Sequence, residues 1–131
     1  MKNYQKIKAT YQKNYHDIMS QNKVFWAFSK ERLEEGKKVL GINDNRSLIS
    51  IGMGGFMPKK NHDKMFELLE NETKRYEKEL KEAKEVTEQA ILLELKNYEC
   101  FYTGNYTEVI NKFKGIYTAK QIKSVYKKFN T

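Results

Sequence analysis

The C-terminal section of the chain carries the residues best suited to binding a partner, because lysines alternate there with large apolar side chains. Lysine contacts phosphate without sequence preference. The section lacks arginine, the side chain best suited to bidentate contacts with guanine. We therefore predict a partner-binding surface in this section, with its two tyrosines as anchors. Its members are Lys112, Lys114, Tyr117, Lys120, Lys123, Tyr126, Lys127 and Lys128.

Two short helices are expected to carry this surface. Thr118 begins a pattern typical of a capping box, which predicts a helix over 119–129. Gly115 is expected to end a preceding helix over about 107–114. Such a pair has the outline of a helix-turn-helix, although Asn111 stands where a small residue is usual. The alternative is a basic amphipathic pair that only closes the core.

A second binding position is predicted after the run Gly52–Gly55, at Lys59 and Lys60. Consecutive glycines can present backbone amides to a phosphate, and the two lysines add positive charge. The run is not a P-loop, because no Gly-Lys-Ser/Thr sequence follows and it does not open a helix. The alternative that we favour is a hairpin turn whose residues adopt positive φ.

Residues for enzymatic or metal chemistry are few. His16, His62 and Cys100 are far apart in the sequence and have no metal-ligand spacing. Cys100 stands in an aromatic segment, where a cysteine is usually just buried. The glutamates of the central segment have no partner that singles out a general acid–base pair. We therefore predict a protein that is not an enzyme and needs no metal or cofactor.

Length and charge limit the organisation of the chain. Its 131 residues are about the length of one ordinary domain, so we expect a single domain over 1–131. Apolar residues make up 39% and aromatic residues 13%, enough to anchor a modest core. The formal charge of +8 is uneven: residues 1–23 carry +4 and residues 100–131 carry +5, whereas residues 61–99 carry −4. Clustered positive charge attracts polyanions, although a lysine-rich composition can also serve solubility alone.

Apolar spacing predicts the elements that position these residues. Tyrosines and isoleucines recur every three or four residues over 4–18, which predicts an amphipathic N-terminal helix. The apolar run 24–28 indicates a buried strand, and Ser29 is expected to cap the helix that follows. Residues 48–51 and 56–57 flank the glycine turn and complete a three-stranded antiparallel sheet.

Two glycines are associated with the helix expected after Ser29, one inside it and one at its end. Gly41 stands where a left-handed residue is needed to end the helix. Gly36 lies inside the helix, where it costs about 1 kcal/mol relative to alanine. We therefore expect Gly36 to mark a close approach to another backbone.

The segment 61–103 contains no glycine or proline and is rich in Glu and Lys partners four residues apart. Its apolar stripe drifts from Ala90 onward, which predicts two helices with a bend near 83–88. A coiled-coil dimer is the alternative, weakened by the polar core positions Thr73 and Thr87. The expected fold is α+β: a small three-stranded antiparallel sheet packed against a long helical hairpin, with short N- and C-terminal helices.

Several of these motifs together resemble a family of small, mostly uncharacterised proteins of bacteriophages and mobile elements. The resemblance covers roughly residues 24–103 and rests on an aromatic run, a glycine-ended acidic motif, a glycine turn and the long Glu/Lys helix. In this chain the first three are Phe25–Ser29, Leu33–Gly36 and Ser50–Phe56, and Asn97–Cys100 is a variant of a further family segment, similar to Asn-x-Glu-Tyr, that follows the helices. Trp26 stands where a second Phe is common in the family, and Leu33 replaces a Phe. Small accessory proteins of bacteriophages are often anti-defence factors, including inhibitors of CRISPR nucleases.

The resemblance and the charge layout together predict an anti-defence inhibitor. Such a protein would bind a host defence protein or ribonucleoprotein complex through its basic surfaces and block nucleic-acid access. The alternative is a basic accessory protein that binds DNA or RNA directly. A membrane partner is not expected, because no apolar run approaches the ~20 residues that span a bilayer. A reducing compartment is expected from the lone cysteine and from residues 1–15, which contain no apolar signal segment. The resemblance implies that this compartment is the cytoplasm of a bacterial host. Monomer and dimer both stay open.

Overall fold

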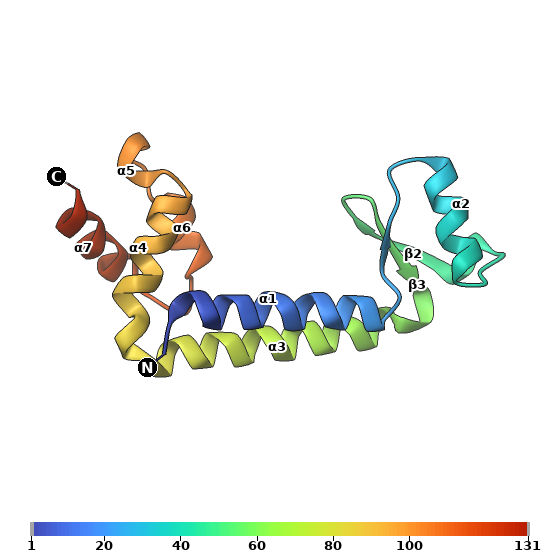
Figure 1. Ribbon diagram of the computed structural model, residues 1–131, viewed down its shortest axis with the longest axis horizontal. Helices are drawn as coiled ribbons and strands as arrows, with labels where there is room; N and C mark the ends of the chain where they lie inside the picture. The colour runs from blue at the N-terminus through green and yellow to red at the C-terminus, as the bar shows by residue number, and fades with distance from the viewer. Residues whose placement is uncertain (1, 131) are drawn as a thin grey trace. The chain divides into compact units, whose positions relative to one another are not determined.

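The computed structural model describes residues 2–130, and its contacts divide the chain into two compact units (Figure 1). The helical unit comprises Met1–Tyr11 and Thr73–Thr131, and the sheet unit comprises Gln12–Glu72. Helices α1 (Tyr4–Gln21) and α3 (His62–Glu82) each contribute residues to both units. The expectation of one domain over residues 1–131 stays a prediction, because contacts alone do not show whether either unit folds by itself.

The sheet unit contains a three-stranded antiparallel sheet. Its strands are β1 (Phe25–Trp26), β2 (Leu48–Gly52) and β3 (Gly55–Pro58), in the order β1-β3-β2. The turn between β2 and β3 is formed by Met53 and Gly54, whose φ angles are 51° and 81°. Positive φ at both turn residues matches the right-handed twist of the two strands. The hairpin turn and the α+β fold class are thereby confirmed.

Helix α2 (Lys30–Val39) follows β1 and is defined by the residues at its two ends. The Ser29 hydroxyl accepts a hydrogen bond from the Arg32 backbone N–H at 3.2 Å, which confirms the predicted cap. Gly41 has a φ of 70° and ends the helix as expected. A methyl group at Gly36 would overlap the Phe25 ring. The close approach at Gly36 is therefore to an aromatic ring, and the expectation of a neighbouring backbone was wrong.

One face of the sheet packs against helices within the sheet unit. Met57 of β3 is buried with Met65 and Leu69 of α3. The partly buried side chains around this cluster are Ile18, Met19, Val24, Ile49 and Ile51. Near this core, the Asn14 amide of α1 donates to the Glu72 carboxylate of α3 at 3.1 Å. The small sheet is thus covered by the paired parts of α1 and α3.

The helical unit holds the C-terminal helices. α3 ends at Glu82, a short 3₁₀ turn spans Lys84–Val86, and α4 (Thr87–Asn97) begins directly after it. The bend predicted near 83–88 is therefore confirmed. Three further helices follow: α5 (Cys100–Thr103), α6 (Thr107–Lys112) and α7 (Ala119–Phe129). None of the helices among the described residues is both long enough and apolar enough to cross a membrane.

The helical hairpin differs in its members from the predicted one. We expected its two arms within 61–103, but α3 pairs with α1, which is 18 residues long and not a short terminal helix. In the helical unit, the Tyr11 ring of α1 stacks on the Tyr76 ring of α3 with centroids 4.2 Å apart. The tyrosine stripe of α1 is therefore a packing face, and α4 packs instead against α5, α6 and α7.

A buried carboxylate connects α1 to α4 in the helical unit. Glu94 is 1% exposed; it accepts hydrogen bonds from the Tyr4 hydroxyl, from Lys8 at 2.8 Å and from Asn97 at 3.1 Å. Burial raises the pKa of the Glu94 carboxyl, but these three donors more than offset that effect and hold its pKa below the ordinary value. Burial, and next the bond to Glu94, raise the pKa of the Tyr4 hydroxyl well above its ordinary value. The network is a structural connection, because Glu94 is closed to any substrate.

Candidate nucleic-acid interface

Helix α7 is built to present one face to solvent. The Thr118 hydroxyl accepts from the Gln121 backbone N–H at 3.1 Å, and the Gln121 side chain accepts from the Thr118 backbone N–H at 2.8 Å. This capping box confirms the predicted start of the helix. Ile122 and Val125 are buried in the helical unit. The side of α7 opposite these two residues is therefore free to carry charge.

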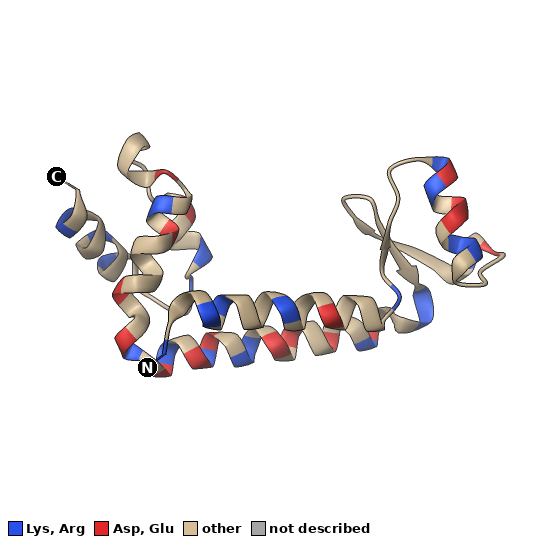
Figure 2. Cartoon of the chain, in the orientation of Figure 1, with Lys and Arg blue, Asp and Glu red and all other residues tan. Residues whose placement is uncertain are grey.

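Three lysines occupy that free side, and we call Lys120, Lys123 and Lys127 the lysine face. At about 100° per residue, they fall within an arc of about 60° and span about 10 Å of helix length. All three are exposed, and none has an acidic partner within ion-pair distance among the described residues. Figure 2 shows α7 with basic residues and no acidic one. The lysine face is thus an uncompensated strip of positive charge on a rigid helix.

The other predicted lysines of this section are exposed too, but two of them are partly neutralised. Lys128 makes an ion pair with Glu88 of α4 at 3.0 Å. Lys112 lies near enough to Glu94 for its charge to lower the pKa of that carboxyl. Lys114 follows α6 and has no ion-pair partner among the described residues. The free positive charge of the predicted set is therefore concentrated on Lys114 and the lysine face.

The two predicted tyrosine anchors are not available as exposed rings. Tyr117 is 7% exposed and packs against the Phe113 ring, with centroids 5.0 Å apart, so its prediction as an anchor was wrong. Burial raises the pKa of its hydroxyl. Tyr126 is half-buried and stacks on Phe101 at 5.3 Å between centroids. Alternating lysines and aromatics therefore mark an amphipathic helix, whose aromatic side closes the core.

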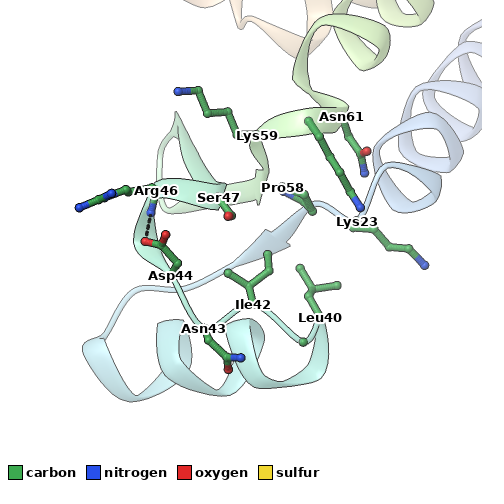
Figure 3. A pocket seen from close by; sticks show the side chains of 12 residues that line it. Lys23, Leu40, Ile42, Asn43, Asp44, Arg46, Ser47, Pro58, Lys59 and Asn61 are labelled. Carbon is green, nitrogen blue, oxygen red and sulfur yellow. Dashed lines mark hydrogen bonds between the residues drawn. The ribbon is translucent and has the colours of Figure 1, made fainter.

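The second predicted position, Lys59 and Lys60, lies in the sheet unit. Both lysines are exposed and line a pocket of about 830 Å³ (Figure 3). Lys23 and Arg46 line the same pocket and were missed by sequence reasoning. They stand 36 and 13 positions before Lys59, and no local pattern links such distant residues. The excess of basic residues over residues 24–60 was the available signal for Arg46, whereas Lys23 lies outside that stretch.

The aromatic run before α2 is more exposed than predicted. We expected residues 24–28 to form a buried strand, but β1 is only two residues long, and Trp26 and Phe28 are 52% and 83% exposed. Each ring lies against a glycine of the hairpin: Phe28 against Gly54, and Trp26 against Gly55. The glycines leave room that a side chain would fill. Together with Met53 at the turn, 92% exposed, the two rings leave apolar surface open to a partner.

The residues weighed for catalysis or metal binding belong neither to the lysine face nor to the lining of the pocket. Cys100 is buried, and burial raises the pKa of its thiol. His62 contacts Asp63 at 3.0 Å and the Phe66 ring. Among residues 2–130, no three His, Cys, Asp or Glu side chains gather in a way that could hold a metal ion. Neither residue is thus assigned a chemical role.

The family to which the chain is matched includes the residues of both surfaces. Residues 3–131 match a family of unknown function, DUF7659. The chain belongs to this family. No curated protein and no solved structure matches the chain. The match to DUF7659 includes the lysine face and the pocket of the sheet unit, but it does not test the resemblance to bacteriophage and mobile-element proteins, which stays a prediction.

Proposed function

We propose that this protein binds nucleic acid through the lysine face, without sequence preference and without catalysis. The observation that carries the proposal is the position of Lys120, Lys123 and Lys127 on one exposed side of α7, free of acidic partners among the described residues. Lysines that contact phosphates release counterions from the nucleic acid, and this release drives association. The buried side of α7 fixes the backbone of the helix, so binding has to order only the lysine side chains.

The chemistry of the lysine face favours phosphates over base edges. Lysine is a point charge that contacts phosphate oxygens without reading sequence, whereas base readout relies on arginine, asparagine and glutamine. The five residues of α7 between Lys120 and Lys127 that are not lysine include Ile122 and Val125, which are buried. We therefore expect similar affinities for mixed-sequence DNA and RNA, with strong dependence on salt.

A charge-reversal experiment tests this function. The variant Lys120→Glu/Lys123→Glu/Lys127→Glu is titrated into labelled mixed-sequence DNA and RNA in a mobility-shift assay at low salt. Loss of three phosphate contacts is expected to weaken binding at least about tenfold. The matched control is Lys30→Glu/Lys38→Glu/Lys64→Glu, which removes the same charge from exposed sites of the sheet unit. Equal binding by both variants, or no binding by the natural chain, would overturn the proposal.

A second candidate function is the inhibitor of a host defence complex, acting in the cytoplasm of a bacterial cell. The specific observation in its favour is the exposed apolar surface of Trp26, Phe28 and Met53, because aromatic and methionine side chains are enriched at protein interfaces. In this case a nuclease complex would be held by both the apolar surface and the lysines. Its nucleic-acid channel would then be blocked by contact alone.

Capture from a bacterial lysate separates the two functions. The tagged chain is compared with its Trp26→Ser/Phe28→Ser variant, each with and without nuclease treatment. The inhibitor function predicts that a defence nuclease is captured after nuclease treatment and is lost with the variant. Direct nucleic-acid binding predicts the reverse: capture that nuclease abolishes and that the variant leaves unchanged.

A further inference from the structure

The sheet unit contains a pocket that the lysine face does not explain. Its volume of about 830 Å³ lies within the range of roughly 300–1,000 Å³ that is usual for small-ligand sites. Its walls come from the loop after α2 and from the segment that joins β3 to α3, with Lys23 between α1 and β1. Figure 3 shows these segments around one hollow. The pocket lies wholly within the sheet unit.

The lining of the pocket combines an apolar wall with a basic rim. Leu40, Ile42 and Pro58 supply apolar surface, and Figure 3 shows the first two pointing from the loop after α2 toward the hollow. Four basic residues line the pocket: Lys23, Arg46, Lys59 and Lys60. The single acidic residue of the lining is Asp44, whose carboxylate accepts from the Arg46 backbone N–H at 2.8 Å. The excess of positive charge is therefore open to a ligand with several negative charges.

The loop that forms the apolar wall is held in place before any ligand binds. Lys37 of α2 is only 7% exposed, and its ammonium group donates to the Asn45 side chain at 2.6 Å. The Ile42 backbone N–H donates to the Lys37 carbonyl at 2.8 Å. On the opposite wall, the Asn61 amide donates to the Asn22 carbonyl at 3.2 Å. A wall fixed by such bonds lowers the ordering cost of binding.

We propose that this pocket binds a nucleotide, with the base against Leu40, Ile42 and Pro58 and the phosphates on the basic rim. A flat base fits an aliphatic wall, and the hydroxyl of Ser47, which lines the pocket, can bond its polar edge. The guanidinium and ammonium groups of the lining give the rim a net positive charge, which suits a group that carries several charges on few atoms, as a phosphate chain does. An acidic peptide spreads its carboxylates over a longer chain and fits this rim less well.

The nucleotide could be free or could be the 5′ end of a strand, and the ligand chemistry is the same. The proposal does not depend on the lysine face, because the pocket and that face belong to different units. Failure of the charge-reversal test on α7 would therefore not affect the proposal for the pocket. Failure of the pocket test would likewise not affect the proposal for the lysine face.

Fluorescence of N-methylanthraniloyl-ATP tests the rim of the pocket in the full chain. We expect saturable binding that weakens at least about tenfold in Arg46→Glu/Lys59→Glu, since two charge-assisted contacts to phosphate are reversed. The control Lys30→Glu/Lys64→Glu makes the same change in net charge outside the pocket, and it is expected to bind as the natural chain does. No binding by the natural chain, or equal loss in both variants, would overturn the proposal.

Displacement experiments test the base and identify the source of the ligand. Unlabelled ATP is expected to displace the probe better than inorganic tripolyphosphate, and Ile42→Ala is expected to reduce this preference while tripolyphosphate binds unchanged. Equal displacement by ATP and tripolyphosphate would show an anion site without a base and would overturn the nucleotide assignment. A 5′-phosphorylated oligonucleotide that competes better than ATP would assign the pocket to a strand end, and the opposite order would assign it to a free nucleotide.

Discussion

The helical unit and the sheet unit use the same kinds of aromatic side chain in different ways. In the helical unit, several rings stack on one another against the core, as Tyr11 does on Tyr76 and Phe101 on Tyr126, although Tyr102 is 91% exposed. In the sheet unit, the ring of Phe28 lies against Gly54 and stays largely exposed. Amphipathic helices can close around rings from several sides, whereas three short strands offer one covered face. Aromatic content alone therefore does not show which rings are buried.

The two basic surfaces also differ between the units. The lysine face is a strip on the outside of one helix, suited to an extended polyanion. The pocket of the sheet unit gathers basic residues from distant parts of the sequence around an apolar wall, which suits a compact ligand. The contrast suggests that each unit has its own binding chemistry. The two units are also expected to be stabilised in different ways.

The largest effect is expected from removing the buried carboxylate of the helical unit. Glu94→Ala leaves the Tyr4 hydroxyl and the Lys8 ammonium without their partner, and we expect a loss of about 3 kcal/mol in the free energy of unfolding. Denaturant unfolding measures the loss, and hydrogen exchange locates it. Protection is expected to fall first in α4 and the N-terminal part of α1. A uniform loss that includes the sheet would contradict a connection confined to the helical unit.

The same carboxylate makes stability depend on pH. Because the pKa of Glu94 is lower in the folded chain than its ordinary value of 4.5, the ionised form stabilises the fold above that value. This contribution is lost as pH falls from about 4.5 through the lower folded pKa. Thermal unfolding between neutral and acidic pH measures it, and the Glu94→Gln variant serves as the control with a flatter profile. Identical profiles for the two proteins would contradict the assigned direction.

An intermediate effect is expected from the ring–glycine contact of the sheet unit. Alanine normally stabilises a helix by about 1 kcal/mol relative to glycine. Gly36→Ala is instead expected to destabilise the chain by about 1–2 kcal/mol, because the added methyl group overlaps the Phe25 ring. In the Phe25→Ala background, the same change is expected to become neutral or stabilising. A double-mutant cycle measures this reversal, and simple additivity would show that the ring and the glycine are not coupled.

The smallest effect concerns the helix that carries the lysine face. Thr118→Ala removes the side-chain oxygen of the capping box, and a loss of about 1 kcal/mol is expected. Chemical denaturation gives the loss, and Thr118→Ser, which retains the oxygen, is the matched control. We expect DNA affinity to change far less than in the lysine variants. If Thr118→Ala weakened DNA binding as strongly as charge reversal, helix position and not charge would be the main requirement.

Local chemistry accounts for the parts of the fold that could be predicted from the sequence. Ser29, Gly41 and the Thr118 capping box were predicted correctly, because each depends on a few neighbouring residues. The pairing of α3 with α1 was not predicted, since it depends on contacts such as Tyr11 with Tyr76, which are 65 positions apart. Stripe patterns show that a helix has a packing face, but they do not name the partner.

The candidate sites show the same limit. The lysines of α7 were found because they alternate with apolar residues along one helix, although that pattern also placed Tyr117 on the surface when it is buried. Of the four basic residues that line the pocket, Lys59 and Lys60 were predicted from the sequence. Lys23 and Arg46 come close to them only in the folded chain. Sequence spacing identifies sites within one element, and chain topology is required for sites built from several.

The salt dependence of nucleic-acid affinity tests the central claim most directly. Binding of mixed-sequence DNA is measured by fluorescence anisotropy at several salt concentrations, for the natural chain and for Lys120→Glu/Lys123→Glu/Lys127→Glu. If the three lysines each neutralise a phosphate, the slope of log affinity against log salt is expected to be shallower in the variant by about 2–3. Equal slopes in the two proteins would mean that these lysines contact no phosphate, and the account of the lysine face would be wrong.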